Sequence, residues 1–119
     1  MRMIISPAKN MKMPEKCLYT LGVPEFQNKT LEIWDVLQKL NPWELESVLK
    51  VNEKLAVQAF LDYKAFMPLQ ICMADKHRAA LTVYDGLVFK NIEAEAFSDE
   101  DMMYAQAHLR ILSGFYGVL

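Results

Sequence analysis

The sequence predicts an α+β fold that is mostly helical, with a short strand at each end of the chain. Three observations support this prediction. A short apolar run, residues 3–5, opens the chain and stops at a serine and a proline. Amphipathic segments with helical spacing follow through the middle of the sequence. The last residues, 115–119, are aromatic and apolar, which is typical of a strand.

The composition is that of one folded domain. The chain has 119 residues, 53% of them hydrophobic and 24% charged. Its formal net charge of -2 excludes a global basic field, so any binding to nucleic acid requires a local patch. No apolar run reaches the roughly 18 residues of a membrane span, and the N-terminus lacks the apolar segment of a signal peptide. Cys17 and Cys72 are far apart in the sequence, so we predict a reduced, cytoplasmic protein.

The first strand and the segment after it can be assigned from proline and glycine. Residues 3–5 form the strand, because Pro7 lacks a backbone donor and restricts the residue before it. Residues 10–26 contain two prolines and a glycine without sustained periodicity. This pattern predicts a surface loop, with a short extended piece around residues 18–19.

Two helices are predicted next. Apolar residues recur at helical spacing from about residue 28 to residue 40. Asn41, Pro42 and Glu44 then begin a second helix. Asn41 can accept from a free N–H, Pro42 suits the first helical position, and Glu44 completes a capping box. This helix runs to about Lys50.

The rest of the chain is predicted to be helical until its last residues. A third helix spans Leu55 to Phe66, and residues 69–81 also have a helical pattern. A short helix or turn through residues 88–92 leads to the clearest start signal, where Ser98 precedes three acidic residues. We predict that this last helix ends at Gly114. One initial strand and these helices cannot complete a sheet, so the chain is expected to be an incomplete half of a larger single-domain fold.

A first candidate binding site lies at the end of the first strand. Ser6 and Lys9 follow this strand directly, and ligand sites in sheet proteins favour strand ends. Lys9 can hold an anion there. Alternatively, Ser6 and Pro7 only terminate the strand, and Lys9 is solvated. The residues alone leave both interpretations open.

A second candidate is the corner between the second and third helices. Backbone N–H groups at a helix N-terminus can bind a phosphate, and Lys50 and Lys54 lie beside this one. This is the pattern of a helix-hairpin-helix motif. However, the turn at residues 51–53 has no glycine and adds a carboxylate, which favours an ordinary helical corner.

Metal binding and catalysis have weaker support, and we predict no metal and no cofactor. Cys72 and His77 form the only close pair among the cysteines and histidines, whereas structural zinc sites use closely spaced pairs of ligands. His108 and Arg110 are both placed on the last helix, two residues apart, and do not share a face. No nucleophile elbow, P-loop or dinucleotide fingerprint is present, so the sequence favours a non-enzymatic function.

Three stretches of the sequence resemble the YaaA peroxide stress family. They are IISPAK at residues 4–9, YDGLVFKNIEA at residues 84–94, and residues 97–119, which end in AQAHLRILSGFYGVL. The resemblance extends over the whole chain in the same order. Family members are longer, and this chain resembles their N-terminal half, 1–119 being the matching part.

The resemblance implies a bacterial peroxide stress (oxidative stress response) protein that lowers intracellular free iron and binds DNA non-specifically. In the family, DNA binding is assigned to a helix-hairpin-helix and a positively charged cleft. The matching segment here is residues 42–66, and its DNA-binding candidates are Lys50, Asn52 and Lys54. Ser6, Lys9 and Arg110 also match family motif positions, and we take them as anion-binding candidates without a catalytic role.

Two alternatives to this function follow from the same residues. The chain can be an uncharacterised enzyme with an anion site at Lys9, in a cleft that the other half of the family fold would close. It can also be an inactive fragment that self-associates, because strand edges meant for another half would be exposed. A homodimer through residues 115–119 is the form of self-association that we predict, and no membrane partner is expected.

Overall fold

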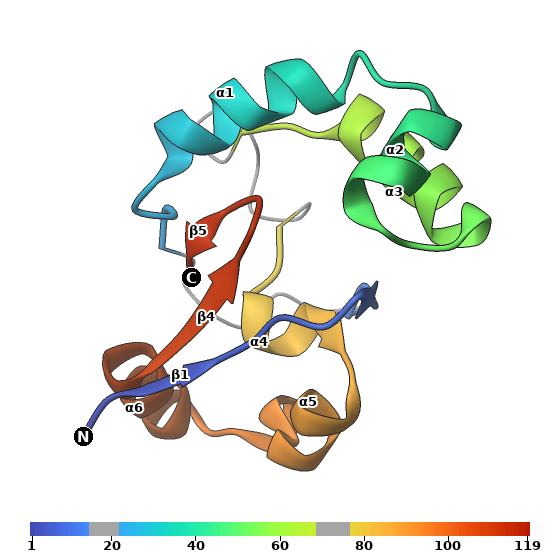
Figure 1. Cartoon of the computed structure of the whole chain (residues 1–119). Coiled ribbons are helices and arrows are strands. Elements are labelled where there is room, and N and C mark those ends of the chain that lie inside the picture. The colour runs from blue at the N-terminus through green and yellow to red at the C-terminus, as the bar shows by residue number, and fades with distance from the viewer. Residues whose placement is uncertain (15–21, 69–76) are drawn as a thin grey trace.

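The computed structural model describes residues 1–14, 22–68 and 77–119. Helices and strands are both present in these ranges, which confirms the predicted α+β class (Figure 1). The strands are β1 (Met3–Ile5), β2 (Asn10–Met11), β3 (Tyr84–Asp85), β4 (Leu109–Ser113) and β5 (Gly117–Val118). The helices are α1 (Gln27–Leu37), α2 (Pro42–Leu49), α3 (Glu53–Ala65), α4 (Ala80–Val83), α5 (Leu87–Ile92), the 3-10 helix η2 (Ala94–Ala96) and α6 (Asp99–His108).

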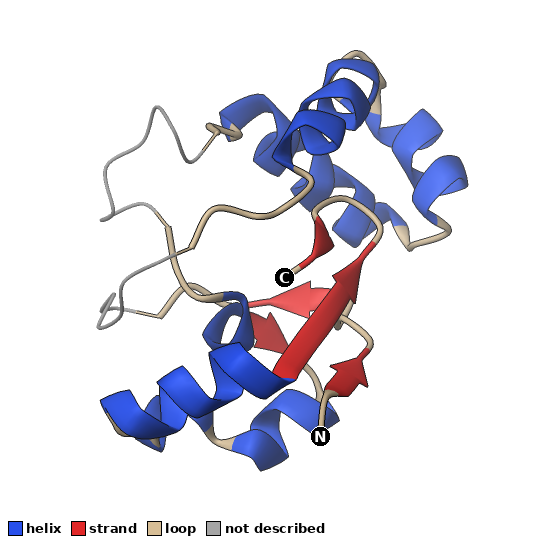
Figure 2. Ribbon diagram, turned by 90° about the vertical axis from the view of Figure 1, so that its left-hand side faces the viewer, coloured by secondary structure: helices blue, strands red, loops and turns tan. Residues whose placement is uncertain are grey.

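The described strands form two small sheets. The first has the order β1-β4-β5, with β1 parallel and β5 antiparallel to the central β4. Ile5 lies opposite Ile111 in this register, so the predicted N-terminal strand is confirmed. In the second sheet, β2 pairs antiparallel with β3. Helices lie above and below the strands in Figure 2.

The last helix begins where it was predicted to begin, but it ends earlier than predicted. Ser98 caps α6, because its Oγ accepts from the N–H of Asp101 at 3.2 Å while a carboxylate oxygen of Asp101 accepts from the N–H of Ser98 at 3.0 Å. The helix then stops at His108, and residues 109–113 form β4. The prediction that the helix continues to Gly114 is therefore wrong.

The physical reason is that residues 109–113 satisfy two patterns at once. Leu109 and Leu112 have helical spacing, but it is Leu109 and Ile111 that pack on the core, two residues apart as in a strand. Leu112 is 46% exposed. Because β1 and β5 flank β4, its backbone groups find partners on both sides. This strand also corrects two further predictions. The strands of this chain do form a sheet, with β4 at its centre. Arg110, which was predicted on the last helix, lies on β4.

The predicted C-terminal strand at residues 115–119 is present in shorter form. A turn occupies residues 114–116, and β5 covers Gly117–Val118. Leu119 extends the pairing, because it exchanges backbone hydrogen bonds of 2.8 and 2.9 Å with Ile111. The end of the described chain is therefore tied to the central strand.

The remaining helix predictions differ in their bounds. α1 ends at Leu37 instead of about residue 40, while α2, α3 and α5 lie close to their predicted positions. The predicted helix at residues 69–81 is seen only as the single turn of α4, because residues 77–79 are not helical. Residues 69–76 lie outside the described ranges, as does the extended piece predicted at residues 18–19.

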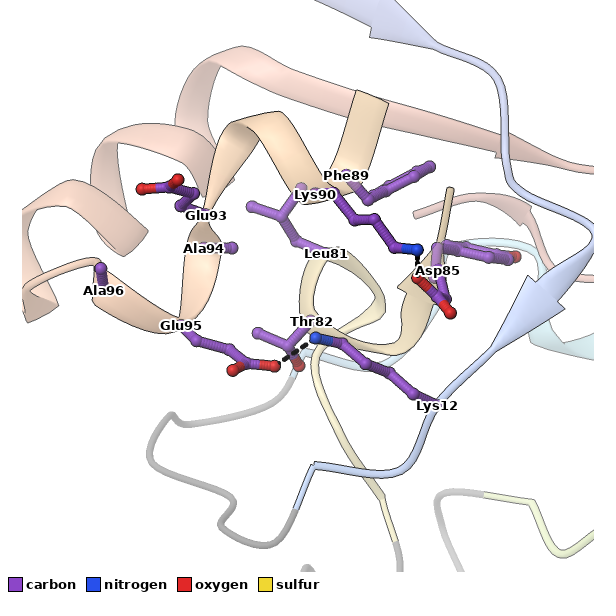
Figure 3. Close-up of a pocket in the computed structure, with 11 residues that line it drawn as sticks. Lys12, Leu81, Thr82, Asp85, Phe89, Lys90, Glu93, Ala94, Glu95 and Ala96 are labelled. Carbon is purple, nitrogen blue, oxygen red and sulfur yellow. Dashed lines mark hydrogen bonds and ion pairs between the residues drawn. The ribbon is translucent and has the colours of Figure 1, made fainter. Parts of the chain in front are cut away.

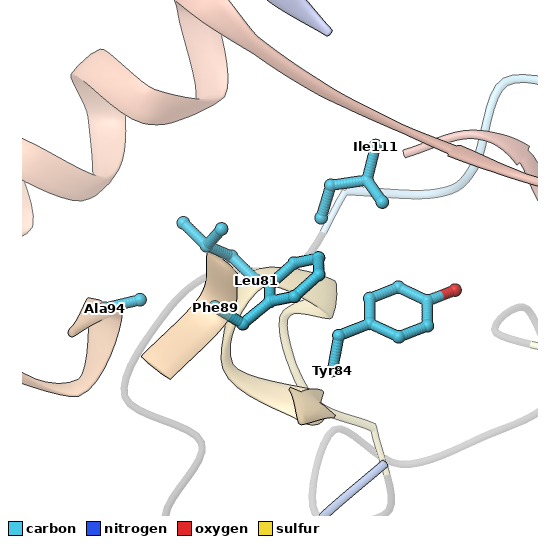
Figure 4. Packing of buried hydrophobic residues seen from close by; sticks show 5 residues of the cluster. All are labelled: Leu81, Tyr84, Phe89, Ala94 and Ile111. Atoms are coloured by element: carbon cyan, nitrogen blue, oxygen red, sulfur yellow. The ribbon is translucent and has the colours of Figure 1, made fainter. Parts of the chain in front are cut away.

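Two clusters of buried apolar residues hold these elements together. The sheet core lies between β1, β4 and the short helices (Figure 4), and it consists of Leu81, Tyr84, Phe89, Ala94 and Ile111. The hairpin core lies between α1, α2 and α3, and it consists of Leu37, Leu45 and Ala56. The sheet core joins segments that are distant in the sequence, since Ile5 of β1 also packs against it.

The turn between β4 and β5 connects the two cores through aromatic rings. Phe115 lies 5.3 Å from Tyr63 and 5.3 Å from Phe66, measured between ring centroids. The Thr30 hydroxyl donates to the backbone oxygen of Phe115 at 3.1 Å, which ties α1 to the same turn. The aromatic C-terminal motif thus positions α1 and α3 against the sheet.

The capping box at α2 provides a test of local stability. Asn41 Oδ1 accepts from the N–H of Glu44 at 3.0 Å, and Glu44 Oε2 accepts from the N–H of Asn41 at 2.8 Å. We expect Asn41→Ala to lower the free energy of unfolding by about 1 kcal/mol, because the N–H of Glu44 loses its side-chain acceptor. Urea unfolding followed by circular dichroism measures this loss. Asn28→Ala, on the exposed face of α1, is the control and should change it by less than about 0.5 kcal/mol.

Candidate nucleic-acid interface

The predicted helix-hairpin-helix-like segment forms a tight helical corner. We call residues 49–56 the α2–α3 corner. Lys50 ends α2 in the left-handed conformation, with φ 52° and ψ 48°. Val51 packs against the hairpin core, and Asn52 caps α3 by accepting from the N–H of Leu55 at 3.0 Å. The inward Val51 and the local cap fix the direction in which α3 starts.

This geometry explains how a turn without glycine can resemble a hairpin motif. A left-handed turn residue is usually glycine, because a side chain costs about 1 kcal/mol in that conformation. In this chain Lys50 adopts it instead. The absence of glycine, which favoured an ordinary corner in the sequence, therefore does not prevent the backbone from making the turn.

The α2–α3 corner presents donors that could bind a phosphate. Lys50 and Lys54 are exposed, and neither forms an ion pair with any residue in the described ranges. The first amides of a helix have no partner within it. Asn52 accepts from the third and fourth of these, through its side chain and its backbone oxygen. The N–H groups of Glu53 and Lys54 are left for an external acceptor such as a phosphate oxygen.

Carboxylates limit the strength of this site. Glu53 opens α3 beside the two lysines, and Glu46 lies one turn before the end of α2. Asn52, a predicted DNA-binding residue, already uses its side-chain oxygen for the cap of α3, so only its amide nitrogen could serve a ligand. The corner therefore offers two lysines and two unpaired amides, while Glu46 and Glu53 offset the charge of the lysines.

The three predicted anion-binding residues occupy different places in the fold. Ser6 and Lys9 are exposed in the loop after β1, while Arg110 lies within β4 beside Ile4. No hydrogen bond or ion pair joins any two of them in the part of the chain that the structure describes. One guanidinium nitrogen of Arg110 donates to the backbone oxygens of Gln106 and Leu109. The described contacts thus do not assemble a common anion site from them.

The histidine on α6 has a structural environment. A ring nitrogen of His108, Nδ1, lies 2.9 Å from the backbone oxygen of Tyr104, and the two rings are stacked with centroids 4.1 Å apart. Among the described residues, no group of three or more His, Cys, Asp or Glu side chains is placed to hold a metal ion. Cys17 and Cys72 lie outside the described ranges.

Sequence reasoning missed one cavity, of about 360 Å³, between β2, β3, α5 and η2 (Figure 3). Its wall includes the buried side chains of Leu81 and Phe89, and two ion pairs lie at its rim. Lys12 pairs with Glu95 at 2.5 Å, and Lys90 pairs with Asp85 at 3.2 Å. No pattern in the sequence indicated it, because β2 was predicted as loop and the first pair joins residues far apart in the chain.

Comparison with known proteins identifies the family. A family model described as peroxide stress protein YaaA matches residues 1–119. Similar curated proteins include a UPF0246 protein of Delftia acidovorans, 37% identical over 123 residues, and one of Bacteroides fragilis, 38% identical over 120 residues. A Francisella tularensis UPF0246 protein is 32% identical over 120 residues.

These matches cover 100% of this chain but only 46% of the Delftia protein and 45% of the Bacteroides protein. The chain thus spans about half the length of the curated relatives it matches. No helix in the described ranges is long and apolar enough to cross a bilayer. The family model covers the same stretches of sequence that carry the resemblance, from the IISPAK segment to the aromatic C-terminal motif. The chain therefore belongs to the YaaA peroxide stress protein family.

Proposed function

We propose that the α2–α3 corner contacts DNA phosphates without sequence preference, as one part of a peroxide stress protein. The observation that supports this proposal is that two exposed lysines, Lys50 and Lys54, lie in the same corner as the free amides at the start of α3. Neither lysine is neutralised by a carboxylate of the described residues. A helix N-terminus and two cations form a site for a phosphate group, and phosphate contacts carry no sequence information.

The affinity that this site can provide is low. Only two lysines contribute, Glu53 lies between them in the sequence, and the chain as a whole has a formal charge of -2. Each neutralised phosphate adds about 0.9 to the slope of log affinity against log salt concentration. We therefore expect weak binding at low salt. The slope of log affinity against log salt concentration should correspond to about two phosphate contacts.

Charge reversal at the α2–α3 corner tests the proposal. We expect the Lys50→Glu, Lys54→Glu double variant to bind labelled duplex DNA about tenfold more weakly at low salt and to lose most of the salt slope, because two phosphate contacts are removed. Fluorescence anisotropy at several salt concentrations measures both quantities. The protein titrated is this 119-residue chain.

A matched control separates a local site from net charge. The double variant Lys29→Glu, Lys39→Glu makes the same change in charge on α1 and in the turn that follows it, where the two lysines pair with Glu32 and Asp35. It should keep the salt slope of the unmodified chain. Equal weakening by both double variants, or no binding by the unmodified chain at low salt, would contradict the proposed site.

We further propose that iron lowering belongs to the complete family protein in the cytoplasm, since this chain spans about half of the relatives' length. After peroxide treatment, cells producing the full-length Delftia relative should contain less chelatable iron than cells producing this chain alone. Electron paramagnetic resonance of chelated iron makes this comparison. Equal iron in cells with the full-length relative and in cells without it would count against the proposal.

A further inference from the structure

One face of the three-stranded sheet is apolar and exposed. Side chains alternate across a strand, and Ile5, Ile111 and Leu119 all pack on the sheet core. Their neighbours along the strands must therefore point to the opposite side. We call this side the outer sheet face, and its residues are Ile4, Arg110, Leu112 and Val118.

Two of the apolar side chains on this face are well exposed. Ile4 is 67% exposed and Leu112 is 46% exposed. In the register of the sheet, Leu112 lies opposite Val118, so apolar side chains adjoin across β4 and β5. All-parallel sheets are normally covered on both faces, and β1 and β4 form a parallel pair within this mixed sheet. An exposed apolar face of this kind marks a surface for another polypeptide.

Arg110 gives this surface a chemical preference. It lies beside Ile4 in the sheet and is partly buried. The protein contacts of its guanidinium are the backbone oxygens of Gln106 and Leu109, and no carboxylate within the described ranges pairs with it. A partner that brings an apolar surface and one carboxylate would bury the aliphatic residues and neutralise this charge.

We propose that the outer sheet face is the docking surface for the remaining half of the family fold. This chain accounts for 46% of the Delftia protein and 45% of the Bacteroides protein, so the relatives contain more than another chain length of polypeptide. A second copy of this chain fits less well. A two-fold pairing of two outer faces would bring like charges, the two Arg110 guanidiniums, into one apolar interface. This proposal is independent of DNA binding.

Fragment complementation tests the proposal. The 119-residue chain is co-expressed, with an affinity tag, beside the part of the Delftia acidovorans protein that it does not match, as a separate polypeptide. We expect the two to co-purify at equal stoichiometry. Leu112→Glu and Ile4→Glu should each reduce the recovered partner about tenfold, because a carboxylate is then placed in the apolar interface. Val48→Glu, at a 59% exposed valine on α2, is the matched control and should have no effect.

Each other outcome overturns the proposal. Failure to co-purify, equal recovery with all variants, or equal loss with Val48→Glu would show that the outer sheet face is not this docking surface. If sedimentation shows a dimer of the chain alone that Leu112→Glu dissociates, the occupant is a second copy. Circular dichroism checks that each variant is folded. If Leu112→Glu on the central strand is not, Ile4→Glu on the edge strand decides the question.

Discussion

Replacing Leu45 by alanine is expected to lower the free energy of unfolding by about 3 kcal/mol. The Leu45 side chain has an exposed fraction of 0% and lies at the centre of the hairpin core, between Leu37 of α1 and Ala56 of α3. Large-to-small changes at such sites cost about 2 to 5 kcal/mol, because burial is lost and a cavity remains. With Ala56 as one neighbour, little side chain is available to fill the space.

Urea unfolding followed by circular dichroism measures this effect. Val48→Ala is the matched control, since Val48 lies on the same helix but is 59% exposed, and it should change the free energy by less than about 0.5 kcal/mol. The Leu45 variant should also weaken DNA binding through the α2–α3 corner, because Val51 would lose part of the packing that orients the turn. If both variants unfold at the same urea concentration, Leu45 does not hold the corner in place.

The features that sequence reasoning predicted correctly are local ones. The capping box at Asn41 and the helix cap at Ser98 each involve residues three positions apart, so their atoms are within reach whatever the rest of the chain does. The strand at residues 3–5 was bounded by a proline, which acts on its own neighbours. The ends of these elements were found at or close to their predicted positions because neighbouring residues set them, although β1 needs the distant β4 as its pairing partner.

The β4 strand was missed because its decisive partners are distant in the sequence. Leu109, Ile111 and Leu112 fit a helix or a strand when read alone, and the pairing on one side of the strand comes from β1, more than a hundred residues earlier. Propensity and periodicity do not contain this information, since tertiary contacts outweigh both. The same limit applies to the cavity, where Lys12, next to β2, pairs with Glu95 of η2.

Only part of the candidate site could be predicted from the sequence. Lys50 and Lys54 could be named from their place beside a predicted helix start. The conformation of Lys50 could not, because a positive φ is expected at glycine and nothing in the local sequence requires it here. The outer sheet face could not be predicted either, because Leu112 and Arg110 lie on the strand that was predicted as helix.

The chain is expected to lose stability between about pH 10 and pH 12 through Tyr116. Burial, assisted by the charges of Tyr84, Tyr63 and Asp62, raises the pKa of Tyr116 to about 12. In the unfolded chain the pKa of a tyrosine is about 10. Below pH 10 the phenol is neutral in both states, and its contribution to stability is fully present. Above pH 10 only the unfolded chain loses the proton readily, so unfolding becomes more favourable, by at most about 2.7 kcal/mol at pH 12.

The difference between two variants isolates this effect from the lysines that titrate in the same interval. Tyr116→Phe has no phenol to ionise, so its free energy of unfolding should fall less steeply from pH 10 to pH 12 than that of the unmodified chain. Tyr104→Phe, at a tyrosine that is 61% exposed, should follow the unmodified chain. Parallel loss of stability in all three proteins would contradict a raised pKa of Tyr116. Because its ring contacts Phe66 and Phe115, such a result would also question the aromatic turn that joins the two cores.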